Sequence, residues 1–431
     1  MMKLMNIPPP GREPRLERNA RQLILVRITN LNEFLAAYGA SASLEIASFI
    51  NVQLETIGIR QSAVALEWPY VFIDPEACRD VGFSCRDAFC ERINAVLSFG
   101  PVMCAEEEAF LRVETTFIDA KDKCVYTGSE YESSRLHGKA WTGRGPDGPN
   151  KQGNAYKADM ARALGLFSKL SARTLVLAFQ PVVSTQNKSL TIYWECLLRH
   201  WEDSSPSGFT TCAISITALE RLGLVGRIDR SILWSTFDVL AKHPEISLGC
   251  NISAQSLQFD CWWRLVFEAL LAQPGVASRL VIEITETSAI SQDDEAIALL
   301  QTLKTLGCKI AVDDMGSGYS TLDFVVRSRP DFVKIDKAYL DPAMNERIPS
   351  SQSILRNLTQ LCANLSPCVI TEGIESERDL ADAVEAGTHA LQGYLLGRPY
   401  VVPYWLNGPI VVRDAFEMGH PSHALSAPDI H

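Results

Sequence analysis

The chain has 431 residues, a formal net charge of −11 and 47% hydrophobic residues. This composition describes a globular protein with room for two or three domains, or for one barrel of about 250 residues and a smaller domain. The acidic balance excludes broad binding to polymeric nucleic acid, and an anionic ligand would need local cations or metal ions.

The sequence also indicates a cytoplasmic protein without a membrane segment. No run of about 18 apolar residues occurs, and the proline-containing N-terminal tail over 1–20 lacks the apolar centre of a signal peptide. The 12 cysteines are scattered without C-x-x-C pairs, which is typical of buried, reduced thiols.

Residues 21–123 predict a small α/β domain. The segments "LILVRI" and "FLRVETTFI" have the pattern of strands, and "SAVALEWPYVFI" predicts two strands joined by a turn. The segment "NEFLAAYGASASLEIASFINVQL" has a helical pattern. The order of these elements predicts a mixed or antiparallel sheet.

Residues 124–156 predict a linker or long loop, because "GKAWTGRGPDGPNKQGN" has no apolar period. A helix is expected over 157–171. From there to residue 410, short apolar strands alternate with amphipathic helices, which predicts parallel β/α units. Two helices carry start and stop signals, Ser291 with Asp294 before Gly307 and Ser376 with Asp379 before Gly387. Residues 411–431 are expected to form a C-terminal tail.

The expected strands of the second half end in polar residues that a buried parallel strand does not tolerate. In a β/α barrel the carboxyl ends of the strands meet at one mouth, where the chemistry is found. The residues are Glu195, Arg199, Asn251, Glu283, Glu286, Asp313, Asp314, Lys334, Asp336, Glu372, Glu375 and Gln392. A single acid in such a place is usually a helix cap or a surface residue, but recurrence on successive strands indicates a site.

Charge balance at this mouth indicates bound metal. The set contains five carboxylates that would repel one another when partly buried: Glu195, Glu283, Asp313, Asp314 and Glu372. Lys334 and Arg199 do not balance them, and unpaired buried charges are costly. Oxygen ligands without His or Cys favour Mg²⁺ or Mn²⁺, and two such ions can promote phosphodiester hydrolysis.

Ordered motifs between about 178 and 400 carry a family resemblance. The segments are "FQPVV", "ECLLRH", "NIS", "EITE", "DDMGSGYS", "VKID", "EGIE" and "QGY". In order and spacing they resemble EAL domains, the bacterial cyclic di-GMP phosphodiesterases. The departures are Cys196 for Ala, Met315 for Phe and Ser317 for Thr, and they leave the metal-binding positions unchanged.

The resemblance implies a TIM-like (β/α)8 barrel and a role for each site residue. Glu195, Asn251, Glu283 and Asp313 bind one metal ion, and Asp313 with Asp314 binds a second. The catalytic residues are Lys334, which holds the water or the scissile phosphate, Glu372, which positions the water, and Asp313. Substrate contacts come from Gln180, Leu197, Arg199, Asp336 and Gln392. Glu286 anchors the "GSGYS" loop, which in the family leads to a dimer interface, so a homodimer is expected.

The N-terminal domain weakly resembles a GGDEF (diguanylate cyclase) domain without its catalytic residues. Arg27 and Thr29 stand where metal-binding aspartates are usual. The hairpin reads "LEWPY", so Trp68 and Pro69 replace the glycine pair that lets the nucleotide approach. We expect a degenerate GGDEF-like module that regulates or dimerises, with an unrelated small α/β sensor as the alternative.

The sequence therefore predicts a metal-dependent hydrolase that converts cyclic di-GMP to linear pGpG. A receptor that binds cyclic di-GMP without cleaving it is the alternative from another class. A third possibility is an enzyme that also contacts a regulatory protein through its N-terminal domain.

Overall fold

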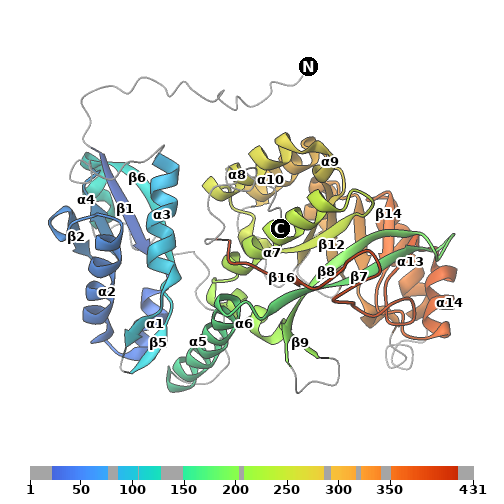
Figure 1. Cartoon of the computed structure of the whole chain (residues 1–431), viewed down its shortest axis with the longest axis horizontal. Coiled ribbons are helices and arrows are strands. Elements are labelled where there is room, and N and C mark those ends of the chain that lie inside the picture. Colours follow the sequence, from blue (N-terminus) through green and yellow to red (C-terminus); the bar gives the residue numbers. More distant parts are fainter. Residues whose placement is uncertain are drawn as a thin grey trace.

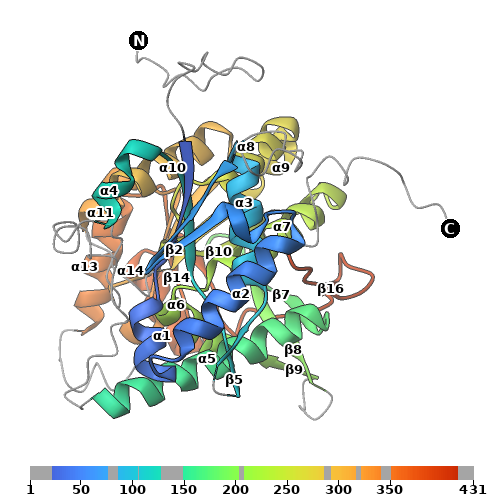
Figure 2. The same ribbon diagram turned by 90° about the vertical axis from the view of Figure 1, so that its left-hand side faces the viewer.

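A computed structural model describes residues 22–75, 86–104, 106–127, 149–202, 208–285, 293–316, 322–340 and 351–415. They form an N-terminal α/β domain beside a larger β/α barrel (Figure 1). Helix α5 (Pro149–Ser171) packs on α1 (Leu31–Tyr38) of the first domain and on α6 (Ala213–Leu222) of the second. Figure 2 looks onto the N-terminal domain, with the barrel behind it.

The N-terminal domain contains an antiparallel sheet in the order β2-β3-β1-β6, within the mixed or antiparallel alternatives that the sequence predicts. The expected helical segment is divided at Gly39, whose φ of 89° ends α1. The elements are β1 (Gln22–Ile28), α1, α2 (Ala42–Thr56), β2 (Val64–Glu67), β3 (Tyr70–Ile73), α3 (Arg86–Phe99), β4 (Val102–Cys104), β5 (Glu107–Ala109), β6 (Val113–Asp119) and α4 (Lys123–Thr127).

Helix α5 begins earlier than the sequence indicates. The expected linker over 124–156 includes α4 at one end and the first turns of α5 at the other, and residues 128–148 lie outside the described part. Proline is tolerated in a first helical turn, and a Cβ at Gly153 would lie 3.6 Å from the Ala36 carbonyl of α1. Tyr156 is buried, and its hydroxyl accepts a hydrogen bond from Asn30 Nδ2 at 3.1 Å. Packing against α1 stabilises a helix that its composition disfavours.

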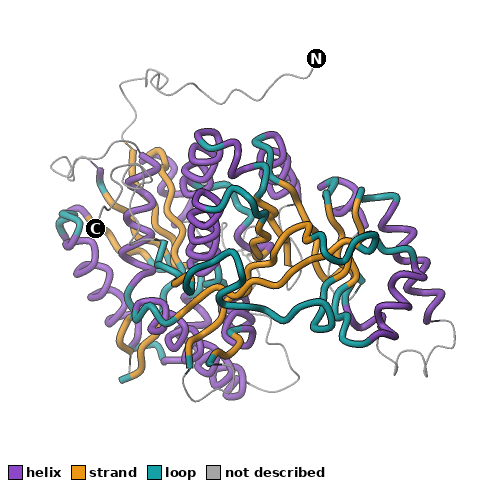
Figure 3. The backbone as a smooth tube through the Cα atoms, turned by 45° about the vertical axis from the view of Figure 1, so that its right-hand side comes forward, coloured by secondary structure: helices purple, strands orange, loops and turns teal. Residues whose placement is uncertain are grey.

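The second domain is a closed barrel in the order β7-β15-β14-β13-β12-β11-β10-β8, with β8 pairing back to β7. This confirms the expected (β/α)8 barrel, and Figure 3 shows helices lying around these strands. Its strands are β7 (Leu175–Ser184), β8 (Thr191–Trp201), β10 (Leu248–Ser253), β11 (Leu280–Thr285), β12 (Lys309–Met315), β13 (Phe332–Ile335), β14 (Cys368–Thr371) and β15 (Ala390–Leu391). A further strand, β9 (Phe209–Thr211), extends β8.

The first barrel strand departs from the predicted parallel arrangement. β7 is antiparallel to both of its neighbours, β8 and β15. The short connection over residues 185–190 explains this, because a parallel pairing needs a crossover of a dozen residues or more. The prediction of parallel pairing is wrong for this strand and right for the remaining barrel strands.

Helices cover the outside of the barrel. Ser376 and Asp379 form a capping box on α14, and Gly387 adopts a left-handed φ of 88° after the last turn, as predicted. Ser291 lies outside the described residues. No described helix is both long and apolar enough to cross a membrane. With α6, the barrel helices are α7 (Gly226–Lys242), α8 (Cys261–Ala272), α9 (Pro274–Ala277), α10 (Asp293–Thr305), α11 (Leu322–Ser328), α13 (Ser351–Ala363) and α14 (Glu377–Ala386).

The packed chain continues past the expected boundary at residue 410. Strand β16 (Ile410–Val411) pairs with β7, and Val412 is fully buried. Asp414 follows, and its Oδ2 lies 2.5 Å from Arg227 Nη2 of α7. The first residues of the expected tail are therefore part of the barrel domain, because they supply β7 with a further antiparallel neighbour.

Candidate active site

Two layers of inward-facing side chains fill the barrel. The upper layer, nearer the carboxyl ends of the parallel strands, is polar: Gln180, Glu195, Asn251, Glu283, Asp313, Lys334, Glu372 and Gln392. The lower layer, which we call the floor, lies two positions away along each strand: Val182, Tyr193, Gly249, Val281, Ala311, Phe332, Ile370 and Ala390. All of the floor residues except Gly249 belong to one buried apolar cluster. Since strand residues alternate between faces, each strand places one residue in each layer.

Lys334 occupies the centre of the polar layer and is fully buried on β13. Its Nζ lies 2.7 Å from Glu372 and 2.8 Å from Glu283. It is also 3.2 Å from Asp313 and 3.4 Å from Glu195. Burial disfavours the ammonium, but the surrounding carboxylates raise the pKa of Lys334 well above its ordinary value.

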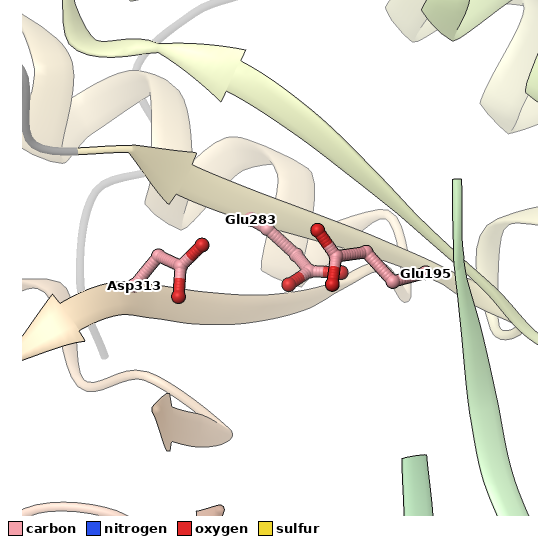
Figure 4. A group of neighbouring side chains, drawn as sticks. All are labelled: Glu195, Glu283 and Asp313. Atoms are coloured by element: carbon pink, nitrogen blue, oxygen red, sulfur yellow. The ribbon is translucent and has the colours of Figure 1, made fainter. Parts of the chain in front are cut away.

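The carboxylates form two groups that share Asp313. Oxygens of Glu195, Glu283 and Asp313 lie within 4.8 Å of one another, and so do oxygens of Asp313, Asp314 and Glu372. Figure 4 shows the first group, in which Glu195 comes from β8, Glu283 from β11 and Asp313 from β12. Asp313 therefore links two groups of carboxylates, each of which could hold a metal ion.

An irregularity in β12 brings both aspartates to the site. The pairing with β13 shifts register between Val312 and Met315, and Asp314 has a left-handed φ of 53°. The Asp314 amide donates to Asp313 Oδ1 at 3.0 Å. Burial, with the nearby charge of Asp313, raises the pKa of Asp314 to about 6. Such strained backbone positions are concentrated at functional sites.

Glu195 on β8 receives two amide donors. Asn251 Nδ2 donates to its Oε1 at 2.7 Å, and Gln392 Nε2 donates to its Oε2 at 2.5 Å. Burial opposes ionisation, but Lys334 and these two hydrogen bonds lower the pKa of Glu195 below its ordinary value. Glu195 is therefore ionised and oriented at neutral pH.

Lys334 compensates the charge of Glu283 and Glu372 only in part. Burial raises the pKa of Glu283 to about 8, and burial together with Asp313 raises the pKa of Glu372 well above its ordinary value. Apart from the ion pair with Lys334, both Glu283 oxygens lack a hydrogen-bond partner among the described residues, as does Asn251 Oδ1. Buried acceptors without donors fit a divalent cation with oxygen ligands, so the residues present can hold one.

The sequence-predicted substrate residues surround this centre. Gln180 on β7 donates to the Gly397 carbonyl at 3.1 Å, and its Oε1 accepts from Gln392 at 3.3 Å. Leu197 and Arg199 follow Glu195 on the same face of β8. Arg199 is half-buried and donates to the Leu198 carbonyl at 2.9 Å.

Two further predicted features lie at the edge of the described structure. The Asp336 carboxylate accepts a hydrogen bond from the Ala338 amide at 2.7 Å. Glu286 and residues 317–320 of the "GSGYS" loop lie outside the described residues.

The sequence interpretation missed Gly249 and Tyr193. A Cβ at Gly249 would lie 1.9 Å from Glu283 Oε1 and 2.7 Å from Tyr193 Cε2. A glycine inside a buried strand often marks a close approach, so its place two residues before Asn251 was an available signal.

Comparisons with known proteins identify the family of the barrel domain. The sequence pattern described as "EAL domain" matches residues 162–399. Over 235 residues the chain is 29% identical to the bifunctional diguanylate cyclase/cyclic di-GMP phosphodiesterase MucR of Pseudomonas aeruginosa, a match covering 53% of this chain and 34% of that relative. It is 31% identical over 230 residues to the cyclic di-GMP phosphodiesterase PdeL of Escherichia coli, covering 51% of this chain and 61% of PdeL.

Among solved structures, the PaMucR phosphodiesterase in complex with c-di-GMP is 26% identical to this chain, with a TM-score of 0.47. The match covers 56% of this chain and 97% of the chain in that structure. The chain spans less than two thirds of the length of either curated relative. The EAL pattern nevertheless covers more than half of the 431 residues and includes every strand of the closed barrel. The chain belongs to the EAL domain family.

Proposed function

We propose that this chain hydrolyses one phosphodiester bond of cyclic di-GMP, giving linear pGpG, in a reaction that depends on Mg²⁺ or Mn²⁺. The observation that carries the proposal is the pair of carboxylate groups that share Asp313 around the buried Lys334. Curated relatives named as cyclic di-GMP phosphodiesterases support the substrate.

Glu195, Asn251, Glu283 and Asp313 would hold one ion, and Asp313 with Asp314 a second. A bound divalent cation of this kind polarises phosphoryl oxygens and lowers the pKa of water. The lowered pKa of Glu195 keeps one strong ligand ionised before any cation arrives. The raised pKa values of Glu283 and Asp314 mean that cation binding releases protons near neutral pH.

Lys334 supplies a fixed positive charge within the site. Because its pKa lies well above the ordinary value, it stays protonated and donates hydrogen bonds at every working pH. We assign it to orient the attacking water or the scissile phosphate. We assign Glu372 to help position the same water, and its distance of 2.7 Å from Lys334 supports this assignment.

Substrate binding is assigned to the residues around this centre. Arg199 is a cation on the same strand face as Glu195, which suits contact with a second phosphate. Gln180, Leu197, Asp336 and Gln392 complete the proposed contacts. The proposal also includes a homodimer, with Glu286 as the anchor of the loop that leads to its interface. The N-terminal domain would have a regulatory role, without cyclase activity, and would contact a protein partner. The proposed location is the cytoplasm.

A receptor that binds cyclic di-GMP without turnover is the less favoured alternative. Such a protein has no need of five converging carboxylates, whose mutual repulsion is costly unless cations bind. The two groups around Asp313 therefore favour an enzyme.

The test is a turnover assay on the full chain. Purified protein is freed of metal, incubated with cyclic di-GMP and either Mg²⁺ or Mn²⁺, and the nucleotides are separated. We expect pGpG with at least one ion and none with chelator. Tight cyclic di-GMP binding without pGpG, in folded protein supplied with both ions, would favour the receptor and refute the enzyme.

A further inference from the structure

The floor beneath the polar layer has one position without a side chain, and it lies under Glu283. Gly249 stands between Glu195 of β8 and Val281 of β11 in the strand register. Each of the seven remaining barrel strands contributes a side chain to the floor at the equivalent position. Gly249 is not among the described glycines with positive φ, so backbone conformation does not explain it.

Close approach of other side chains explains the glycine. The position of a Cβ at Gly249 lies 1.9 Å from Glu283 Oε1, 3.0 Å from Glu283 Cδ and 2.7 Å from Tyr193 Cε2. Cβ atoms in real structures do not come so near to other heavy atoms, so even alanine would displace its neighbours. The Glu283 carboxylate therefore extends down to the level of the floor.

Tyr193 borders the same space, because its Cε2 lies 2.7 Å from the position of a Cβ at Gly249. Its ring is buried and packs against Phe332, with the ring centroids 5.3 Å apart. The ring belongs to the close-packed floor, so it can move little without disturbing that layer. Lys334 Nζ contacts the second oxygen, Glu283 Oε2, at 2.8 Å. We call the space bounded by Gly249 and Tyr193 the Glu283 seat.

We infer that the Glu283 seat fixes the depth at which the first cation binds, so that Gly249 and Tyr193 are positioning residues for the metal site. The inference deepens the proposed function, because it assumes that Glu283 is a cation ligand. Residues that orient a metal ligand typically affect metal affinity by 10–100-fold. Gly249 acts by leaving space, and Tyr193 acts by closing that space on one side.

The test measures Mn²⁺ affinity by calorimetry on metal-free full-length protein without nucleotide. We expect Gly249→Ala to weaken binding at the tighter site by about 10–100-fold. Gly275→Ala is the matched control, because a Cβ there meets nothing within 4 Å, and it should keep wild-type affinity. Wild-type affinity in Gly249→Ala would overturn the inference.

A second variant separates the seat from general damage to the barrel. Glu283→Asp shortens the side chain by one methylene, which relieves the contact with a Cβ at position 249. We therefore expect Gly249→Ala to weaken Mn²⁺ binding at least about fivefold less in the Glu283→Asp background than in the wild type. Rescue of folding by Glu283→Asp, if Gly249→Ala alone does not fold, also supports the seat. Equal losses in both backgrounds, or no rescue, contradict it.

The outcomes distinguish this inference from the proposed function. If the wild-type protein binds Mn²⁺ but makes no pGpG, the proposed enzymatic function is refuted, and the Mn²⁺ affinities of the variants decide whether the inference about the Glu283 seat is correct. Wild-type protein that makes pGpG, with variants that all bind Mn²⁺ equally, refutes the seat alone. Wild-type protein that binds neither Mn²⁺ nor Mg²⁺ refutes both.

Discussion

Lys334 Nζ lies 2.8 Å from a Glu283 oxygen, and both side chains are entirely buried. One ammonium faces four carboxylates in this way, so full ionisation of the four acids leaves an excess of negative charge that Lys334 does not offset. That excess is the physical origin of the first two predictions below.

Replacing Lys334 with methionine should lower the rate of pGpG formation by about 100–1,000-fold, because a preorganised cation is lost from the reacting centre. Initial rates under saturating Mn²⁺ measure the effect. Lys309→Met is the matched control, since Lys309 is exposed at the opposite end of the barrel on β12, and it should retain activity. A rate in Lys334→Met within twofold of wild type would exclude the assigned role.

Mn²⁺ should stabilise the folded protein, because only the folded chain brings the carboxylates together. At 100 times its dissociation constant a ligand adds about 2.7 kcal/mol to the free energy of unfolding. Urea unfolding with Mn²⁺ and with chelator measures this. Asp313→Asn, at the acid shared by both groups, should abolish most of the gain. Glu385→Gln on the surface of α14 is the control, and an equal gain in both variants would contradict the site assignment.

Asp229 on α7 should make stability depend on pH. Its carboxylate is buried and accepts hydrogen bonds from the Ser253 amide at 3.0 Å and from Ser256 Oγ at 2.6 Å. Burial raises the pKa of Asp229 from 3.8 to about 7. The folded state thus holds a proton that the unfolded state releases. The contribution of Asp229 to the free energy of unfolding is therefore full below pH 3.8 and is lost as pH rises through about 7.

The rise in the pKa of Asp229 from 3.8 to about 7 limits this contribution to the free energy of unfolding to roughly 4 kcal/mol. The difference between the free energies of unfolding at pH 5 and at pH 8 should therefore be about 2 kcal/mol smaller in Asp229→Asn than in the wild type. The same pH dependence in both proteins would show that Asp229 is not the group responsible.

Gly153→Ala should raise the free energy of unfolding by about 0.5–1 kcal/mol, because alanine favours a helix. The added Cβ would make an ordinary contact, 3.6 Å from the Ala36 carbonyl. Gly165→Ala, in the middle of the same helix with nothing within 4 Å, is the reference and should gain a similar amount. A gain at Gly165 without one at Gly153 would mean that α5 does not extend through Gly153.

The sequence predicted best the features that depend on the local residues of a single strand or helix. Alternating strands and helices predicted parallel β/α units, and the resemblance to EAL domains implied the barrel. Polar residues named at the strand ends meet in the polar layer, including Glu195 and Gln392, which are 197 residues apart and joined by a hydrogen bond. The capping box at Ser376 also followed from local chemistry.

Features that depend on packing between distant segments were not predictable in this way. The start of α5 is stabilised by Asn30 and α1, which no local pattern near Pro149 reveals. The antiparallel course of β7 depends on the brevity of one connection. Gly249 is informative only when Glu283 and Tyr193 are known to lie above and beside it.

The position of β7 has a consequence for how the protein is made. This first barrel strand pairs with β8, but its other neighbours are β15 and β16, near the end of the described chain. During synthesis the ring cannot close until those last strands leave the ribosome, and pairing across such separations is slow. Until then Glu195 lacks its Gln392 donor. The site is therefore completed only when a segment 197 residues beyond Glu195 has been translated.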